Sequence, residues 1–253
     1  MLLKDKVAVI TGGASGIGRA SALLFAQNGA HVVCVDIDDT GGHETIEMIE
    51  CNQLHADYVH ADVTDAAQVQ ALARECERLR GKVDVLFNNA GRNKMQTFEE
   101  TTEETWNEML NVHLTGTFLC SKYLLPLMKN ASSGSIINHA SVDSSLGNPS
   151  IAAYSAAKGG LLPLTHVMAH DLAKYSIRVN SLSSGGIRTA MSMTRSKEAG
   201  NQARVSLTPL QRMGTPEEVA FAALFFACDW SSFINGANLV VDGGRTAITQ
   251  GCF

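Results

Sequence analysis

Short runs of apolar, often β-branched residues recur along the chain, and longer amphipathic stretches separate them. The runs cover residues 7–10, 32–35, 58–63, 83–87, 135–138, 178–182 and 238–241. Helical periodicity marks stretches between them, for example 16–28, 66–79, 103–129 and 155–175. Apolar strands that alternate with helices are typical of a parallel sheet covered on both faces, because each crossover lays a helix on one face. The pattern therefore predicts an α/β, Rossmann-like, doubly wound parallel sheet of about seven strands.

The chain of 253 residues shows no internal repeat, low-complexity tract or linker that would divide it. We therefore expect one domain over residues 1–253. Residues 183–214 form the one long segment without a clear period, and they include several glycines and Pro209. Aperiodic segments of this length inside a compact domain are often binding loops. We expect a substrate loop at about 187–212.

Composition narrows the class of protein. Hydrophobic residues make up 45% and charged residues 18% of the chain, the balance of an ordinary globular protein. The net charge of −5 and the scattered basic residues argue against nucleic acid as a partner. The N-terminus reaches charged residues too soon for a signal peptide, and no apolar run could span a membrane. Six cysteines without a C-x-x-C pair, most within apolar runs, favour buried thiols over disulfides and hence a cytoplasmic protein.

A glycine-rich turn directly follows the first apolar run and opens the first helical stretch. It reads Thr11-Gly12-Gly13-Ala14-Ser15-Gly16-Ile17-Gly18. Glycines let the backbone approach a pyrophosphate, which the free N–H groups and the dipole of the helix attract. The spacing is neither the usual G-x-G-x-x-G of dinucleotide-binding proteins nor a P-loop. A turn without a ligand is the alternative for this motif alone.

Asp36 ends the second run, about 20 residues beyond the glycine turn. A carboxylate at this point accepts hydrogen bonds from both ribose hydroxyls of adenosine and repels a 2′-phosphate. Neither the turn nor the residues just beyond Asp36 hold a lysine or arginine to neutralise such a phosphate. The sequence favours NAD over NADP. The alternative is that Asp36 only caps a turn before Asp38 and Asp39.

From Lys6 to Gly244 the sequence resembles the classical short-chain dehydrogenase/reductase family. The motifs that carry the resemblance are Thr11-Gly-x-x-x-Gly-x-Gly18, Asp62-Val63, Asn88-Asn89-Ala90-Gly91, Asn111, Ser141, Tyr154-x-x-x-Lys158 and Val241-Asp242-Gly243-Gly244. Each motif is modestly specific, but their order and separations together are not expected by chance.

The resemblance implies a set of cofactor-binding residues. These are Gly12, Ser15, Gly16, Ile17, Gly18, Asp36, Asp62, Val63, Asn89, Ala90, Gly91, Tyr154, Lys158, Ile187 and Thr189. The pair Asp62-Val63 would flank the adenine, and Ile187 and Thr189 would contact the carboxamide. In one departure, the chain reads Ser184-Gly185 where similar proteins usually read Pro-Gly. Proline fixes φ, so its loss predicts a more mobile loop on the nicotinamide side.

Four residues are the candidate catalytic group: Asn111, Ser141, Tyr154 and Lys158. Tyr154 and Lys158 are four apart on a predicted helix, so both side chains emerge on one face. The ammonium and the nicotinamide ring would favour the phenolate, which makes Tyr154 a general base. Ser141 would stand at a strand end and bind the substrate oxygen. In the family pattern, Asn111 holds a water that links Lys158 to solvent.

Each of these residues has a duller explanation when taken alone, as a helix aromatic, a solvated charge, a turn residue or a cap. The constellation favours catalysis. His166 and His170 have the spacing of metal ligands but lack the glutamate of His-Glu-x-x-His, so we expect no metal. His113 and His139 lie near the proposed site or simply pack beside the sheet. Met191 and Met193 either line a pocket or fill gaps.

These observations together predict an NAD-dependent oxidoreductase that interconverts a secondary alcohol and its ketone. The mixed side chains near the site favour a neutral, mostly apolar substrate, with alicyclic compounds as one option. The alternatives are an enzyme that uses NAD transiently, such as a dehydratase or epimerase, and a non-catalytic NAD-binding regulator or structural protein. The family resemblance implies a homotetramer, joined through residues 104–129, 153–175 and the C-terminal strand. Residues 221–227 and 251–253 would be buried between subunits or within one chain.

Overall fold

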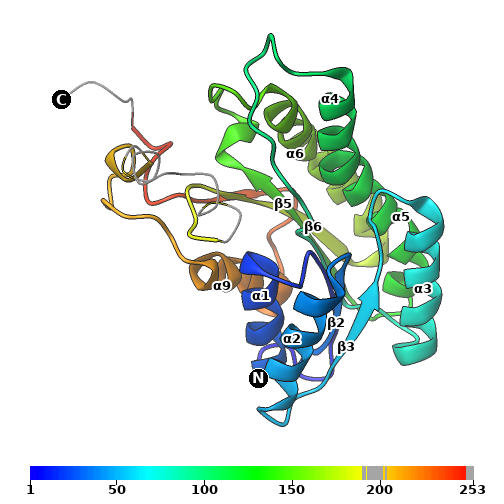
Figure 1. Cartoon of the computed structure of the whole chain (residues 1–253). Coiled ribbons are helices and arrows are strands. Elements are labelled where there is room, and N and C mark those ends of the chain that lie inside the picture. Colours follow the sequence, from blue (N-terminus) through cyan, green and yellow to red (C-terminus); the bar gives the residue numbers. More distant parts are fainter. Residues whose placement is uncertain (190–191, 193–201, 203, 249–253) are drawn as a thin grey trace.

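The computed structural model describes residues 1–189, 192, 202 and 204–248 and contains one seven-stranded parallel sheet (Figure 1). The strands are β1 (Val7–Thr11), β2 (His31–Asp36), β3 (Ala56–His60), β4 (Val85–Asn88), β5 (Gly134–Ser141), β6 (Ile177–Ser184) and β7 (Asn238–Val241). Their order across the sheet is β3-β2-β1-β4-β5-β6-β7. The predicted α/β class and the strand number are confirmed.

Helices follow most of the strands. They are α1 (Gly16–Gln27), α2 (Asp39–Glu50), α3 (Ala66–Arg80), α4 (Glu103–Leu110), α5 (Gly116–Lys129), α6 (Ala152–Leu172) and α9 (Pro216–Ala227). The stretch predicted as one helix over 103–129 is divided by a π-helical turn, η1 (Asn111–Thr115). Such turns interrupt α-helices frequently at functional sites. Within the ranges given above, no helix combines the length and apolarity needed to cross a membrane.

Helices cover both faces of the sheet. On one face, side chains such as Phe25 of α1, Ile46 of α2 and Val219 of α9 pack on the strands. On the other face, the core includes Leu72 of α3 and Leu124 of α5. The central strands are buried along their whole length, which explains why their sequences are continuous apolar runs instead of alternating ones.

The third strand begins and ends earlier than the sequence pattern predicts. It covers Ala56–His60, and the pattern suggested 58–63. The reason is its pairing with β2, in which His60 lies opposite Asp36, the last residue of that strand. Asp62 and Val63 therefore lie beyond the strand, in the connection to α3.

The strand order reverses between β1 and β4, and this reversal positions the site. The chain runs from β1 outward to β3 and then returns to place β4 on the other side of β1. The two outgoing connections diverge there and leave a crevice at the carboxyl ends of the strands. The connection after β1 is the glycine turn, and the one after β4 begins with Asn89.

Candidate active site

A cavity of about 750 Å³ occupies this crevice. Most of the predicted site residues line it, namely Gly12, Ser15, Gly16, Ile17, Asp36, Asp62, Val63, Asn89, Ala90, Gly91, Ser141, Tyr154, Lys158, Ile187 and Thr189. Gly18 and Asn111 are absent from its described lining. Residues 190, 191, 193–201 and 203 of the predicted substrate loop, with Met191 and Met193, lie outside the described residues, so the loop stays a prediction.

The glycine turn has the shape that a phosphate requires. Gly12 and Gly16 have φ values of +70° and +53°, a conformation that side chains disfavour. Gly18 packs directly against the backbone of this turn, because a Cβ atom at position 18 would lie 1.9 Å from the carbonyl oxygen of Gly12. Ser15 makes no side-chain cap to α1, so the amides of the first helical turn are not covered by it. A pyrophosphate fits such a turn.

Asp36 stands at the rim of the same cavity. Its carboxylate accepts hydrogen bonds from the backbone N–H groups of Ala14 at 3.0 Å and Ile37 at 2.8 Å. The guanidinium of Arg19, the cation next to the glycine turn, is occupied by several partners, among them the backbone oxygen of Ala14 in the turn itself. The guanidinium also donates to Thr45 at 3.0 Å and forms an ion pair with Glu44 at 2.9 Å. This end of the cavity therefore fits an adenosine whose ribose hydroxyls face a carboxylate.

Tyr154 and Lys158 lie one turn apart on α6, as predicted. The Nζ atom of Lys158 is 5.8 Å from the centroid of the Tyr154 ring. The ammonium is buried and donates a hydrogen bond to the backbone oxygen of His139. Burial lowers the pKa of Lys158 from 10.5 to about 7, against a smaller raising effect of Asp143. A cation of reduced basicity thus stands beside the tyrosine.

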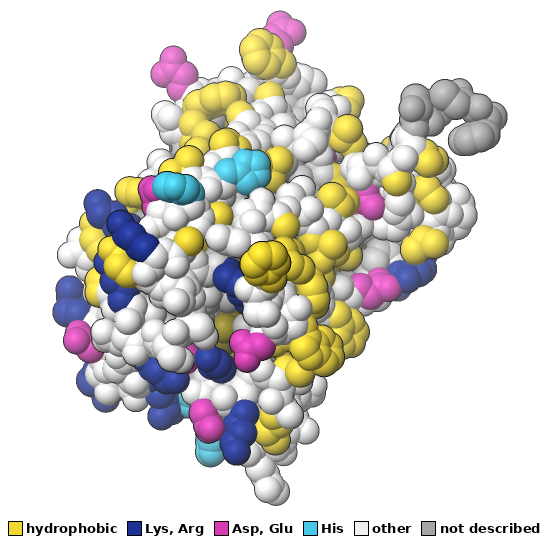
Figure 2. Space-filling model, turned by 180° about the vertical axis from the view of Figure 1, so that it is seen from behind, with side chains coloured by type: hydrophobic (Ala, Val, Ile, Leu, Met, Phe, Trp, Pro, Cys, Tyr) yellow, Lys and Arg dark blue, Asp and Glu magenta, His cyan; other side chains and the backbone are white. Residues whose placement is uncertain are grey.

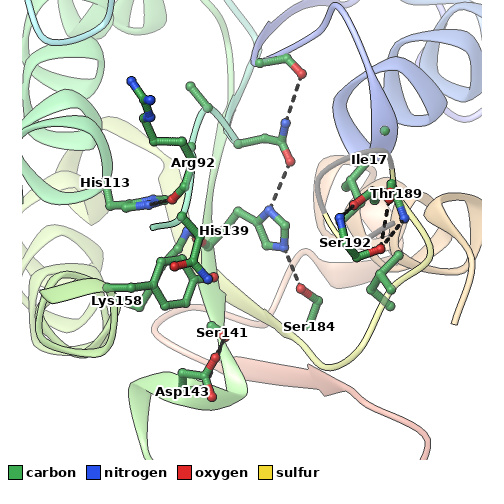
Figure 3. Close-up of a pocket in the computed structure, with 18 of the residues that line it drawn as sticks. Ile17, Arg92, His113, His139, Ser141, Asp143, Lys158, Ser184, Thr189 and Ser192 are labelled. Carbon is green, nitrogen blue, oxygen red and sulfur yellow. Dashed lines mark hydrogen bonds between the residues drawn. The ribbon is translucent and has the colours of Figure 1, made fainter. Parts of the chain in front are cut away.

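Ser141 is the last residue of β5, where its side chain enters the cavity. Its hydroxyl donates to the Oδ2 atom of Asp143 at 3.2 Å and accepts from the backbone N–H of Asp143 at 3.1 Å (Figure 3). Asn148 donates to the other carboxylate oxygen, and Arg245 donates to the Oδ1 atom of Asn148 at 2.9 Å. A substrate oxygen could accept the hydrogen bond of the Ser141 hydroxyl in place of Asp143.

Asn111 is not among the described residues that line the cavity, and its role in holding a water near Lys158 stays a prediction. Asn111 is exposed at the start of the π-helical turn, with its side chain toward Thr115. His113, two residues later, is buried and lines the cavity instead. Residues two apart on a helix face different sides, so only one of the two can point inward. Because a π-turn breaks the helical periodicity, the sequence pattern does not predict which of its side chains point inward.

His113 lies beside Tyr154. The two rings are 5.0 Å apart between centroids, with the edge of one toward the face of the other. The Nε2 atom of His113 donates to the backbone oxygen of Arg92 at 2.6 Å. The Nδ1 atom is buried without a hydrogen-bond partner among the described residues. Burial, aided by the charge of Lys158, holds the pKa of His113 well below 6.5, so the ring is neutral.

His139 occupies the centre of a second arrangement. Its Nδ1 atom lies 3.0 Å from the Oδ1 atom of Asn89, and its Nε2 atom lies 3.0 Å from the hydroxyl of Ser184. Figure 3 shows this path between the glycine-turn side of the cavity and the end of β6. The sequence left His139 undecided between the site and simple packing, and the structure places it in the cavity wall.

Metal ligation finds no support in the part of the chain that the structure covers. His166 and His170 are both exposed on α6, and His170 bonds to the neighbouring Asp171. Across the described ranges, no three histidine, cysteine or carboxylate side chains are grouped so as to hold an ion.

Comparisons with known proteins give the family. A family model described as "Enoyl-(Acyl carrier protein) reductase" matches residues 12–246. The oxidoreductase YxbG of Bacillus subtilis is 42% identical, with 98% of this chain and 93% of the relative covered. A cyclopentanol dehydrogenase of Comamonas testosteroni is 36% identical, with 97% and 98% covered. The crystal structure of a levodione reductase superposes with a TM-score of 0.94 at 30% identity, with 98% and 100% covered.

The chain therefore belongs to the short-chain dehydrogenase/reductase family. It is an oxidoreductase of this type, and its fold class follows that of the solved relatives.

Proposed function

We propose that the protein is an NAD-dependent dehydrogenase that interconverts a secondary alcohol and its ketone. The observation that carries the proposal is the meeting of Ser141, Tyr154 and Lys158 in one cavity with the glycine turn. These residues come from β5 and α6 in the middle of the chain, while the turn follows β1 near its start. One cavity thus combines a dinucleotide cradle with groups for acid–base chemistry.

Different residues of the cavity would bind the cofactor and transfer the proton. Gly12, Gly16 and Asp36 would hold the adenosine and pyrophosphate, and Ile187 and Thr189 would flank the other end. A nicotinamide nucleotide bound there accepts a hydride in oxidation and donates one in reduction. Tyr154 removes the hydroxyl proton of the alcohol, and the Lys158 ammonium stabilises the phenolate that makes this possible.

Ser141 completes the acid–base group. Its hydroxyl releases Asp143 and donates to the substrate oxygen, where negative charge develops. In ketone reduction the same groups act in reverse, with Tyr154 as the acid. In the oxidation direction, the Lys158 ammonium releases a proton toward solvent and then takes up the proton held by Tyr154, which restores its charge. We assign Asn111 no direct contact with the reacting groups, because it is exposed and is not part of the described cavity lining.

NAD is the proposed cofactor. Asp36 presents negative charge where NADP carries its 2′-phosphate, and a phosphate there would be repelled. Arg19 would not offset this charge, because Glu44, Thr45 and backbone oxygens already bind its guanidinium. Oxidation of the alcohol is then the proposed physiological direction.

The proposed substrate is neutral and mostly apolar, with alicyclic alcohols as the first candidates. Apolar side chains in the described cavity wall include Met95, Val142 and Ile151. The comparison proteins named for cyclopentanol and for levodione support the alicyclic class. The alternative is a regulator that binds NAD without turnover. The presence of Ser141, Tyr154 and Lys158 in one cavity favours an enzyme over such a protein.

The test is NADH formation at 340 nm with NAD and a panel of aliphatic, alicyclic, aromatic and steroid secondary alcohols. Activity should disappear in Tyr154→Phe. Tyr175→Phe, the same change outside the cavity, should leave it intact. Tight NADH binding without turnover on the whole panel would favour the regulator. Tighter binding of NADPH than of NADH would overturn the cofactor and the direction.

We further propose a cytoplasmic homotetramer. Apolar side chains are exposed on two regions that the family resemblance assigns to subunit contacts. They are Phe118 and Val167 on α5 and α6, and Phe221, Trp230, Phe233, Leu239 and Val240 from α9 to β7. Figure 2 shows hydrophobic side chains gathered in patches on the rear face. Sedimentation of a monomer at micromolar protein would remove the assembly. The cysteines described are all free thiols, which suits a reducing compartment.

A further inference from the structure

We propose that His139 is a positioning residue that ties the end of β6 to the turn after β4 and so fixes the nicotinamide side of the cofactor cleft. The tie runs from Asn89 through the imidazole to the hydroxyl of Ser184. It replaces, by two side-chain hydrogen bonds, the backbone restraint that a proline at 184 would give. The inference rests on the proposed binding of a nicotinamide nucleotide.

The hydrogen bonds of Asn89 assign the tautomer of His139. The amide nitrogen of Asn89 donates to the backbone oxygens of Thr11 at 3.0 Å and Gly12 at 3.2 Å. Its Oδ1 atom is therefore an acceptor, and the Nδ1 atom of His139 must carry the proton. The Nε2 atom is left with a lone pair, so the Ser184 hydroxyl donates to it. Every bond in the path then has one donor and one acceptor.

The ring keeps this tautomer over the working pH range. Burial and the charge of Lys158 lower the pKa of His139 to about 3. A neutral ring with both nitrogens bonded can rotate only by leaving two partly buried partners unsatisfied. His139 thus holds a fixed position and links the glycine-turn side of the cavity to the end of β6.

The register of the sheet explains why His139 reaches Ser184. Ser141 lies opposite Ser184 in the pairing of β5 with β6. His139 and Ser141 are two apart on a strand, so both side chains point to the same face. The hydroxyl of Ser183 points the other way and donates to Asn238 at 2.8 Å. Only Ser184 can therefore meet the imidazole.

Ser184 is the last residue of β6. Apart from the bond between Ser184 and His139, backbone hydrogen bonds on the side away from the cavity hold the turn beyond it. The N–H of Gly185 donates to the oxygen of Val241 at 3.0 Å, and Gly186 accepts from the N–H of Gly214 at 3.0 Å. The bond to His139 holds the same turn from the cavity side. The sequence predicts a freer loop here for want of proline, and the structure supplies a restraint in its place.

The backbone of His139 also binds a residue of the proposed acid–base group. Its carbonyl oxygen accepts from the Nζ atom of Lys158. A shift of His139 would therefore move the lysine as well as the turn at Ser184. One residue sets the distance between the acid–base group and the nicotinamide end of the cleft.

The test compares His139→Leu, Ser184→Pro, the double variant and the control Ser183→Ala. We expect His139→Leu to weaken NADH binding by on the order of tenfold, since it removes two partly buried hydrogen bonds. Ser184→Pro should bind nearly as tightly as the natural protein, and in the double variant it should restore most of the loss. Ser183→Ala, which removes a partly buried hydrogen bond on the other face of β6, should not change NADH affinity.

A second readout needs no cofactor. In the free protein, hydrogen exchange at the Gly185 amide should be faster by about tenfold in His139→Leu and in the milder Ser184→Ala. Failure of Ser184→Pro to rescue His139→Leu, or unchanged exchange in Ser184→Ala, would overturn the positioning role. A natural protein that binds neither NADH nor NADPH would instead refute the proposed function, and the exchange experiment would still decide on His139.

Discussion

The ring of His113 stands edge-on to the ring of Tyr154, with 5.0 Å between centroids and 89° between planes. This is a favourable geometry for two aromatic groups. The hydrogen bond from His113 to the oxygen of Arg92 fixes the imidazole, and the imidazole in turn limits how Tyr154 can move. The residue that orients the proposed base thus comes from the π-helical turn between α4 and α5.

The first prediction follows from this contact. His113→Ala should lower kcat by about fivefold, because Tyr154 loses an edge-to-face neighbour worth roughly 1 kcal/mol. Asn111→Ala, two residues earlier on the same turn, should leave kcat within about twofold of the natural protein. Steady-state kinetics at saturating cofactor measures both. A larger loss of kcat in Asn111→Ala than in His113→Ala would instead support a catalytic role for Asn111.

The second prediction concerns the pH dependence of stability. Lys158 titrates near 10.5 when unfolded and at about 7 when folded. Between these pH values the unfolded state binds more protons, so this residue makes stability rise with pH from about 7 to about 10.5. Lys158→Met should therefore be more stable than the natural protein at pH 6.5, by on the order of 4 kcal/mol.

This advantage should shrink as the pH approaches 10, and urea unfolding over that range would measure it. The control Lys174→Met removes an exposed lysine and should show no such trend. An advantage of Lys158→Met that stays constant with pH would mean that burial does not lower the pKa of Lys158.

The third prediction tests Asp36 as the determinant of cofactor choice. Asp36→Asn removes the charge but keeps the size of the side chain, so the preference for NAD over NADP should fall by about tenfold or more. Asp39→Asn, an exposed carboxylate on α2, should leave the preference unchanged. The ratio of kcat/KM for the two cofactors is the measurement. A preference that Asp36→Asn does not alter would leave its carboxylate only the role of a turn cap.

The fourth prediction separates a structural glycine from a dispensable one. Gly18→Ala should destabilise the fold by about 2–3 kcal/mol, because its Cβ would stand 1.9 Å from the backbone oxygen of Gly12. Gly147→Ala introduces a Cβ with no atom within 4 Å and should change stability by less than about 0.5 kcal/mol. Thermal or urea unfolding would compare the two variants. Equal losses of stability in the two variants would show that the glycine turn can shift to accommodate a Cβ atom at position 18.

Most of the fold could be predicted from the sequence because the signal is local. The apolar runs at 32–35 and 135–138 fall within β2 and β5, since buried parallel strands need continuous apolar residues. The ends of strands depend on their partners, which is why β3 stops at His60 opposite Asp36. The glycine turn and the Tyr154–Lys158 spacing are likewise local patterns, and the structure places them at one cavity.

Two features of the site could not be predicted in the same way. The choice between Asn111 and His113 depends on the phase of a π-helical turn, which a count of 3.6 residues per turn does not give. The pairing of His139 with Ser184 joins residues 45 positions apart and depends on the register between β5 and β6. The sequence reveals the missing proline at 184 but cannot reveal the imidazole that meets the serine.

The place of β7 in the sheet bears on the solubility of the protein. This strand forms one margin of the sheet, and Leu239 and Val240 on it are 37% and 41% exposed. Within the described ranges no further strand pairs with β7, and an edge strand that carries apolar side chains is a template for aggregation. Association of protomers along β7 would therefore protect solubility as well as build a quaternary structure. Variants that weaken the proposed contact should precipitate before they lose their catalytic geometry.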